Sequence, residues 1–453
     1  MNMKIFVNQI INKDFLAGFM TKWLLCFLVV LNVSAGQTAA GQRQVGGWPQ
    51  LRSDDRDIHG VVFSEAGTAM SFPKMTLGSI GALELSFDDF DARLKNYSYT
   101  YERCDANWEP VLQSAFDYIQ GFADNRIQVG KFSSLTKTKY VHYTAILPNS
   151  QSQIKKSGNY LLKVYLDSDT SKLAFERRML VVDPKVAVSA QVVRPNGGSP
   201  MGEGDQQRLD LSITVNRLSL QNPRDQLKVV VLQNWRWDNA VRNLQPSFMR
   251  GTSYEYNSQR DLLFGAGKEY RWADLRSFRF LSDRVASASE LDGNPADYEV
   301  ALKVDQQRLG TQYMPYQDYN GFYQIASSEN NVVSYQGQYA LVRFSYKSAT
   351  GAAYSNKDLY VLGLFNQYRK DDNSRMVFNP AKGLYEKTLL LKQGYYSYLY
   401  GLATEPGQAT QTDITEGNYW ETENTYTVLV YYQSYSDRGP ELVACQTVSS
   451  RER

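Results

Sequence analysis

Alternating apolar and polar residues in the stretch 83–184 constrain the fold of this chain more than any other feature. Leu83, Leu85 and Phe87 alternate with polar residues, and the same pattern returns over Tyr97–Tyr101. Successive side chains of a β-strand point to opposite faces, so each run can bury one face and expose the other. The sequence therefore predicts antiparallel strands stacked as a sandwich, and nothing inside this stretch indicates catalysis.

The N-terminus has the features of an export signal. A lysine precedes the apolar run Trp23–Leu31, and Val33–Ala35 offers small residues where signal peptidase cleaves. The run is shorter than the roughly 20 apolar residues that span a bilayer. We expect a signal peptide over 1–35 and an exported product, with either Met1 or Met20 as the start of translation.

The mature chain is too long for one ordinary core, since domains usually run to ~100–200 residues. We expect an all-β protein of tandem antiparallel β-sandwich domains. The first should be immunoglobulin- or fibronectin-III-like, because Ser157–Tyr160 opens a strong strand as the tyrosine corner of such sandwiches does. The expected divisions are a flexible leader (36–56), an N-terminal sandwich (57–184), a second β-rich domain (185–325) and a C-terminal sandwich (326–453). Whether the last two are one domain stays open.

Three pairs of alternating runs predict hairpins, because a connection that contains Gly or Pro joins the two runs of each pair, and the first of these hairpins is long. They are 186–192 with 209–215, 384–391 with 395–402, and 425–432 with 441–448. One short helical turn is expected within Val111–Ile119.

Composition narrows the class of partner. The formal net charge is +2 and no long basic block occurs, so nucleic acid is set aside as a partner. Tyrosine is abundant, with 32 residues. Its rings fit pleated sheets, and they are also enriched at contact surfaces, so both readings stay open at any one position. The large number of tyrosines over the whole chain favours a binding protein.

Two cysteines follow the expected cleavage site, Cys104 and Cys445. An exported protein can form a disulfide, and this one would join the first domain to the last. Each cysteine also lies in a predicted strand, where a free thiol packs as a small apolar residue. The sequence leaves both states open.

Catalytic chemistry is poorly represented. His59 and His142 are the only histidines, and His142 lies in an alternating strand, where we expect a hydrogen-bonded core or face residue. Paired carboxylates could serve hydrolysis or hold calcium, but they fall at strand ends and turns, where Asp commonly accepts bonds from its own backbone. We expect no enzyme activity, no cofactor and no metal site. The carboxylate groups are Asp88, Asp89 and Asp91, then Asp167 and Asp169, then Asp371 and Asp372.

Two further motifs invite a functional reading. Gly265–Lys268 lacks the glycine spacing of a phosphate loop, and a turn with glycine at positive φ is the better interpretation. Trp235 and Trp237 share one face of an extended segment with Arg236 opposite, and Trp108 follows Cys104. These four residues, Trp108, Trp235, Arg236 and Trp237, are our candidates for partner binding, and a packed edge between sandwiches is the alternative.

Several short motifs, in their order and spacing, resemble the plug protein family of the type IX secretion system. The resemblance covers most of the mature chain and weakens toward the C-terminus. It implies a periplasmic protein that binds the large outer-membrane β-barrel translocon and closes its pore, without a small-molecule substrate. The motifs are Tyr101–Trp108, Gly121–Ile127, Tyr140–Tyr143, Leu147–Asn149, Ser157–Tyr160, Gln233–Ala240 and Gly265–Arg271.

Other functions compete with this one. A periplasmic or surface carbohydrate-binding protein is the main alternative, since exposed aromatic rings on β-sandwiches stack on sugars. An integral outer-membrane barrel is disfavoured because the strands carry charges on both faces and the chain ends in Arg451–Arg453. Secreted cargo is disfavoured because the last segment lacks a Gly-rich, Lys-ended strand pattern.

Overall fold

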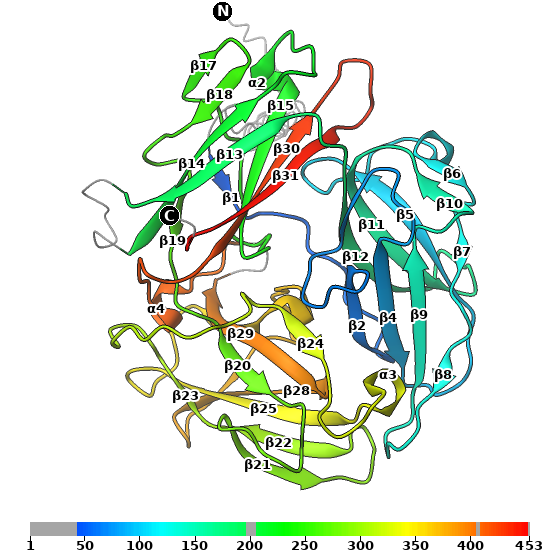
Figure 1. The fold of residues 1–453 in the computed structure, drawn as a ribbon. Coiled ribbons are helices and arrows are strands. Elements are labelled where there is room, and N and C mark those ends of the chain that lie inside the picture. The colour runs from blue at the N-terminus through cyan, green and yellow to red at the C-terminus, as the bar shows by residue number, and fades with distance from the viewer. Residues whose placement is uncertain (1–42, 196–204, 405–407, 452–453) are drawn as a thin grey trace, which may run out of the picture. The chain divides into compact units, whose positions relative to one another are not determined.

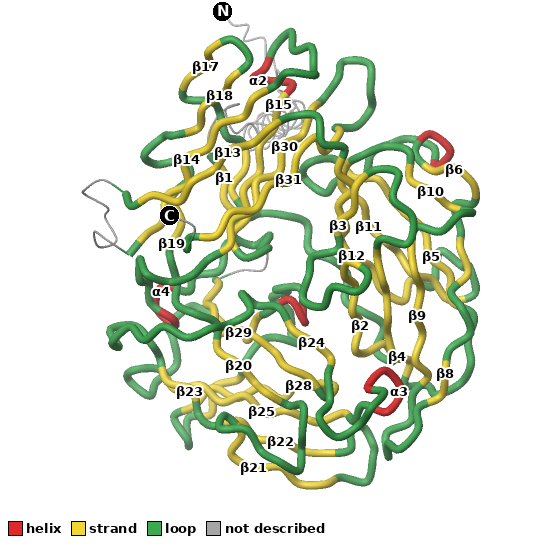
Figure 2. Tube along the Cα trace, in the orientation of Figure 1, coloured by secondary structure: helices red, strands yellow, loops and turns green. Residues whose placement is uncertain are grey.

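The computed structural model describes residues 43–195, 205–404 and 408–451 (Figures 1 and 2). Within these ranges the protein is built almost wholly from β-strands, which confirms the all-β prediction. The predicted signal peptide lies outside the described residues. The described helices are single turns, and η1 falls inside the segment where a helical turn was expected. They are η1 (Ala115–Asp117), α2 (Pro223–Gln226), α3 (Val333–Gln336), η2 (Leu364–Asn366) and α4 (Asp413–Glu416).

The first β-sandwich forms where the alternation predicted it. Leu83, Leu85 and Phe87 of β4 are fully buried and share one core with Tyr99 and Leu162 of the facing sheet. The side chains between them face away from that core, as the period of two requires. The sheet orders are β2-β4-β9-β8 and β3-β12-β11-β5-β7, beside a β10-β6 pair. The strands are β2 (Ile58–Glu65), β3 (Lys74–Thr76), β4 (Leu83–Asp89), β5 (Tyr97–Cys104), β6 (Ile119–Gly121), β7 (Asn125–Arg126), β8 (Lys131–Phe132), β9 (Val141–Leu147), β10 (Ser152–Ile154), β11 (Gly158–Leu166) and β12 (Leu173–Val182).

A tyrosine ties the start of β11 to the preceding turn. The Tyr160 hydroxyl donates to the backbone carbonyl of Lys156 at 2.8 Å. Tyr396 repeats the arrangement later in the chain, where its hydroxyl donates to the carbonyl of Lys392 at 2.6 Å. Such a bond fixes a strand to its corner, as in immunoglobulin sandwiches. The immunoglobulin-like classification of the first domain stays a prediction.

A second core lies between a five-stranded sheet, β1-β16-β15-β30-β31, and the sheet β13-β14-β18-β17, in which β14 also pairs with β19. The predicted hairpins at 186–215 and 425–448 are confirmed, since β13 pairs with β14 and β30 with β31, both antiparallel. The strands are β1 (Gln44–Val45), β13 (Ala187–Val193), β14 (Gln206–Thr214), β15 (Leu227–Gln233), β16 (Val241–Arg242), β17 (Phe248–Arg250), β18 (Ser253–Tyr256), β19 (Leu263–Gly265), β30 (Thr425–Tyr432) and β31 (Glu441–Ser449).

A third core is rich in tyrosine and lies between the sheet β20-β29-β24, with β26 also on β29, and the sheet β21-β22-β25-β28-β27. Strands β22 and β23 pair with β25 in parallel, and β3 pairs with β12 in parallel, so the sheets are not purely antiparallel. The strands are β20 (Arg271–Asp274), β21 (Val285–Glu290), β22 (Tyr298–Leu302), β23 (Asp305–Gln306), β24 (Tyr323–Ile325), β25 (Tyr339–Lys347), β26 (Asp358–Leu362), β27 (Val377–Asn379), β28 (Leu384–Lys392) and β29 (Gly394–Ala403).

The hairpin predicted for 384–391 and 395–402 is wrong. β28 pairs with β25 and β27, whereas β29 pairs with β20, β24 and β26 in the other sheet. The short connection is therefore a corner at which the chain passes from one sheet to the next. Gly394, the first residue of β29, allows β24 to approach closely, because a Cβ there would lie 2.4 Å from the carbonyl oxygen of Gln324.

The observed strand pairing does not respect two of the predicted boundaries, the one at residue 325 and the one between the leader and the first sandwich. β15 pairs with β30, and β22 pairs with β25, so both later sandwiches combine strands from before and after residue 325. The leader predicted for 36–56 is packed into the fold over its described part, since β1 pairs with β16 and the Trp48 and Leu51 side chains are buried. We propose that 185–453 forms two interleaved sandwiches rather than two consecutive ones.

Candidate functional site

The predicted partner-binding tryptophans lie in a buried aromatic cluster. Trp235 stacks on Phe72 with ring centroids 4.4 Å apart and an interplanar angle of 3°. Trp237 meets Trp48 and Trp108 edge-on, at centroid distances of 5.3 and 5.0 Å. Trp108, Trp235 and Trp237 are only 2%, 7% and 7% exposed. The cluster joins side chains from the first sandwich, the N-terminal segment and β15.

Arg236 is enclosed beside them and is 5% exposed. Its guanidinium pairs with Asp238 at 2.8 Å and lies over the Tyr368 ring at 5.3 Å. Burial alone would raise the pKa of Asp238, but Arg236 outweighs it and lowers that pKa to about 2. A partner could reach these side chains only by displacing the cluster. Their role in partner binding therefore stays a prediction that the packing does not favour, whereas a packed edge accounts for their position.

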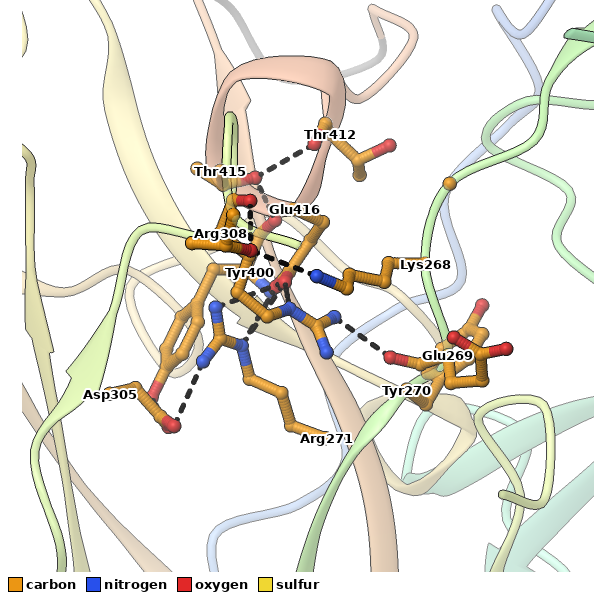
Figure 3. Close-up of polar contacts among 12 residues, drawn as sticks. Lys268, Glu269, Tyr270, Arg271, Asp305, Arg308, Tyr400, Thr412, Thr415 and Glu416 are labelled. Atoms are coloured by element: carbon orange, nitrogen blue, oxygen red, sulfur yellow. Dashed lines mark hydrogen bonds and ion pairs between the residues drawn. The ribbon is translucent and has the colours of Figure 1, made fainter. Parts of the chain in front are cut away.

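A buried charge network joins β20, β23 and α4 (Figure 3). Arg271 lies 2.9 Å from Asp305 and 3.0 Å from Glu416, and Arg308 lies 2.6 Å from the same Glu416. The Tyr400 hydroxyl donates to Asp305 at 2.9 Å. Burial opposes ionisation of Asp305 and Glu416, but the arginines outweigh it and lower both pKa values. Because both carboxylates are paired with arginines, including Arg284 beside Asp305, the network fixes three segments in place.

The glycine motif lies at the edge of this network (Figure 3). Gly267 adopts a φ of +69°, which confirms the predicted turn. The Lys268 ammonium donates to Thr311 at 2.9 Å and lies 4.7 Å from the centroid of the Tyr419 ring. These contacts anchor the 308–320 loop, and they give the lysine a structural role.

A second buried cluster centres on Asp88. One carboxylate oxygen accepts from Lys392 and from the Tyr339 hydroxyl, both at 2.5 Å, and the other lies 2.6 Å from Nδ1 of His142. The Lys392 ammonium also donates to the carbonyl of Ser334 at 2.6 Å. Burial alone would raise the pKa of Asp88, but Lys392 and His142 lower it. His142 is thus the hydrogen-bonded residue that the sequence predicted, and the cluster joins the first sandwich to the third.

A cleft of about 550 Å³ opens beside the Asp88 cluster. Its floor is the outer face of β2, β4 and β9, with small side chains such as Ser64, Ser86 and Thr144, and β24 and α3 form a wall. His142 and Lys392 line it. Asp88 already neutralises Lys392, so that end of the cleft presents no uncompensated charge.

Two further carboxylates accept hydrogen bonds within turns, and both cysteines are free. Asp169 accepts the backbone N–H of Ser171 at 3.0 Å, and Asp371 accepts that of Asn373 at 3.0 Å, which confirms the turn interpretation for these two. Among the described residues, no group of three or more His, Cys, Asp or Glu is placed to hold a metal ion. Cys104 and Cys445 are free thiols rather than a disulfide. No helix in the described part of the chain could span a membrane.

Sequence reasoning missed both buried charge clusters. Asp88 was noted only as part of an acidic group, and Arg271 only as the end of a motif. The partners of Arg271 lie 34 and 145 positions away, so no local pattern could have revealed them.

The stacked sheets define an all-β, multi-sandwich protein. Residues 58–183 match the first domain of the type 9 secretion system plug protein. The crystal structure of a hypothetical protein from Parabacteroides merdae ATCC 43184, solved at 2.30 Å, is also similar. Its TM-score is 0.82 at 30% sequence identity, and the match covers 90% of this chain and 100% of that chain. No curated protein matches the sequence. The first sandwich of this chain is therefore a plug-family domain of the type 9 secretion system.

Proposed function

We propose that this protein is a periplasmic plug, located at the inner side of the outer membrane. It binds a large outer-membrane β-barrel translocon and closes its pore between secretion events. The match of residues 58–183 to the plug family carries the proposal. The export signal expected over 1–35 agrees with a periplasmic location.

The physical requirements of such a plug are size and stiffness. Buried networks around Arg271 and Asp88 hold distant segments at fixed positions, because separating either pair of charges would leave an uncompensated charge in the interior. A body built in this way can block an opening without making or breaking bonds. We therefore propose a non-enzymatic role in which binding supplies the whole effect.

A pull-down from solubilised outer membranes tests the proposal. Tagged protein is incubated with membranes of the bacterium that encodes it, and an equally tagged, unrelated periplasmic β-sandwich serves as the control. We expect selective recovery of a very large integral β-barrel protein. Recovery of soluble glycans alone would favour the carbohydrate-binding alternative, and recovery of no barrel would refute the plug proposal.

A further inference from the structure

We propose that the free edge of β21 accepts an extended segment of the translocon as an added β-strand. This inference rests on the proposed function and specifies its contact surface. β21 is the outermost strand of its sheet (Figure 1). Among the described residues, β22 is the only strand hydrogen-bonded to it.

The backbone of β21 is accessible over most of its length. Ala286, Ser287, Ser289 and Glu290 are exposed, and Ala288 is half-buried. Small side chains allow a second backbone to approach closely. Sheet edges of this kind pair readily with another chain, and proteins usually protect them with lysine, proline or bulges. β21 contains neither lysine nor proline, and it has one bulge at its start. Its last residue, Glu290, pairs with Lys137 of the first sandwich at 3.0 Å, so the unprotected part of the edge is 286–289.

Exposed apolar side chains lie at the N-terminal end of this edge. Phe280 is 83% exposed and Leu281 45%. The Phe280 backbone is restrained, because its N–H donates to Ser277 Oγ at 2.8 Å. Val304, 43% exposed, lies at the same end of the β21–β22 hairpin, since the N–H of the preceding residue donates to the carbonyl of Arg284 at 2.9 Å. An exposed aromatic side chain near the end of an open edge is suited to anchor an incoming segment.

These features specify the occupant. A strand edge offers donors and acceptors spaced by about 3.3 Å per residue, and an extended polypeptide supplies the complementary series, as in β-augmentation. Sugars and lipid chains do not supply such a regular series of donors and acceptors. The fitting partner is an extended loop or terminus of the barrel that places an apolar side chain against Phe280. A second copy of this chain would pair edge to edge instead, and the experiment separates the two.

Site-specific photo-cross-linking tests the inference. A benzophenone amino acid replaces Ser287 or Ser289, and the tagged protein is irradiated with solubilised outer membranes. Ser189 provides a matched control position, because it is also an exposed serine in an edge strand, β13. We expect a covalent adduct with the integral barrel from the β21 positions and none from Ser189.

Substitution of the proposed anchor, Phe280, gives a second test that leaves the residues of β21 unchanged. Phe280→Ser should lower the adduct yield about tenfold, the loss typical of a truncated anchor. Phe248→Ser, which truncates a 55% exposed phenylalanine in β17, should leave the yield unchanged. Equal melting temperatures for both variants and the wild type establish that the fold is retained.

Each alternative outcome is decisive. Capture of the barrel without an adduct at β21 would overturn this inference and leave the plug proposal standing. Failure of the wild-type protein to capture any barrel would refute the plug proposal itself. A cross-linked homodimer through Ser287 or Ser289 would show that a second copy occupies the edge, which also overturns the inference.

Discussion

Replacing Lys392 by methionine should strongly destabilise this protein. The Lys392 ammonium and the Asp88 carboxylate are 2% and 1% exposed and lie 2.5 Å apart. Breaking a buried pair by removing one partner typically costs about 3–5 kcal/mol, because the other charge stays in the interior. Asp88 retains hydrogen bonds from Tyr339 and His142, which reduce the penalty. We therefore expect Lys392→Met to lower the free energy of unfolding by about 3 kcal/mol.

The reciprocal variant gives the coupling between the two charges. Asp88→Asn leaves the ammonium with the Ser334 carbonyl at 2.6 Å and the Tyr140 ring at 4.5 Å. We expect a loss of about 3 kcal/mol here as well. The double variant removes both charges, so its loss should be smaller than the sum of the single losses by about 2 kcal/mol.

Urea unfolding at pH 7 measures these losses, with circular dichroism and tryptophan fluorescence as independent probes. Coincident transitions are required before free energies are compared. Lys387→Met is the matched control on the same strand, because this lysine donates only to the backbone carbonyl of Asp372 near the surface. It should change stability by less than about 1 kcal/mol. A loss below 1 kcal/mol for Lys392→Met, or strict additivity in the double variant, would refute the reasoning.

Three further predictions concern other buried groups. Burial raises the pKa of Asp318 to about 7, so wild-type stability relative to Asp318→Asn should fall by about 3 kcal/mol as pH rises from about 4 to about 7. Thermal unfolding across that pH range measures this loss. Burial raises the pKa of the Cys104 and Cys445 thiols to about 12, so both should react slowly with a thiol reagent at pH 8 and fully after unfolding. Tyr160→Phe and Tyr396→Phe should each cost about 1 kcal/mol in urea unfolding, because each removes a buried hydroxyl donor.

Each of these three predictions has an outcome that would contradict it. A stability difference between wild type and Asp318→Asn that is independent of pH would show that the carboxyl titrates normally. Absence of reactive thiols after unfolding without reductant would establish a disulfide. Tyrosine variants as stable as the wild type would show that the corner bonds contribute nothing.

Local patterns predicted the strands but not all of their partners. The run from Leu83 to Phe87 could be read correctly because burial of alternate side chains depends on the strand itself. The connection before Gly394 could not be read correctly, because β28 and β29 pair with strands that are distant in sequence and belong to different sheets. The same limit applies to the boundary expected at residue 325, which the β15–β30 pairing crosses.

Candidate sites were harder to predict than strands. The sequence placed Trp235 and Trp237 on one face, yet it could not distinguish an exposed face from a packed one. Burial against Phe72 and Trp48 came from segments more than a hundred residues earlier. The free edge of β21 was missed as well, because an alternating run does not reveal whether both edges of a strand are paired.

Conductance through the purified barrel tests the central claim most directly. The barrel is reconstituted in a planar lipid bilayer, and this protein is added to the periplasmic side at increasing concentration. The plug account predicts a saturable drop in conductance that reverses when the protein is washed out. A conductance that stays the same while the protein is bound would contradict pore closure as its function.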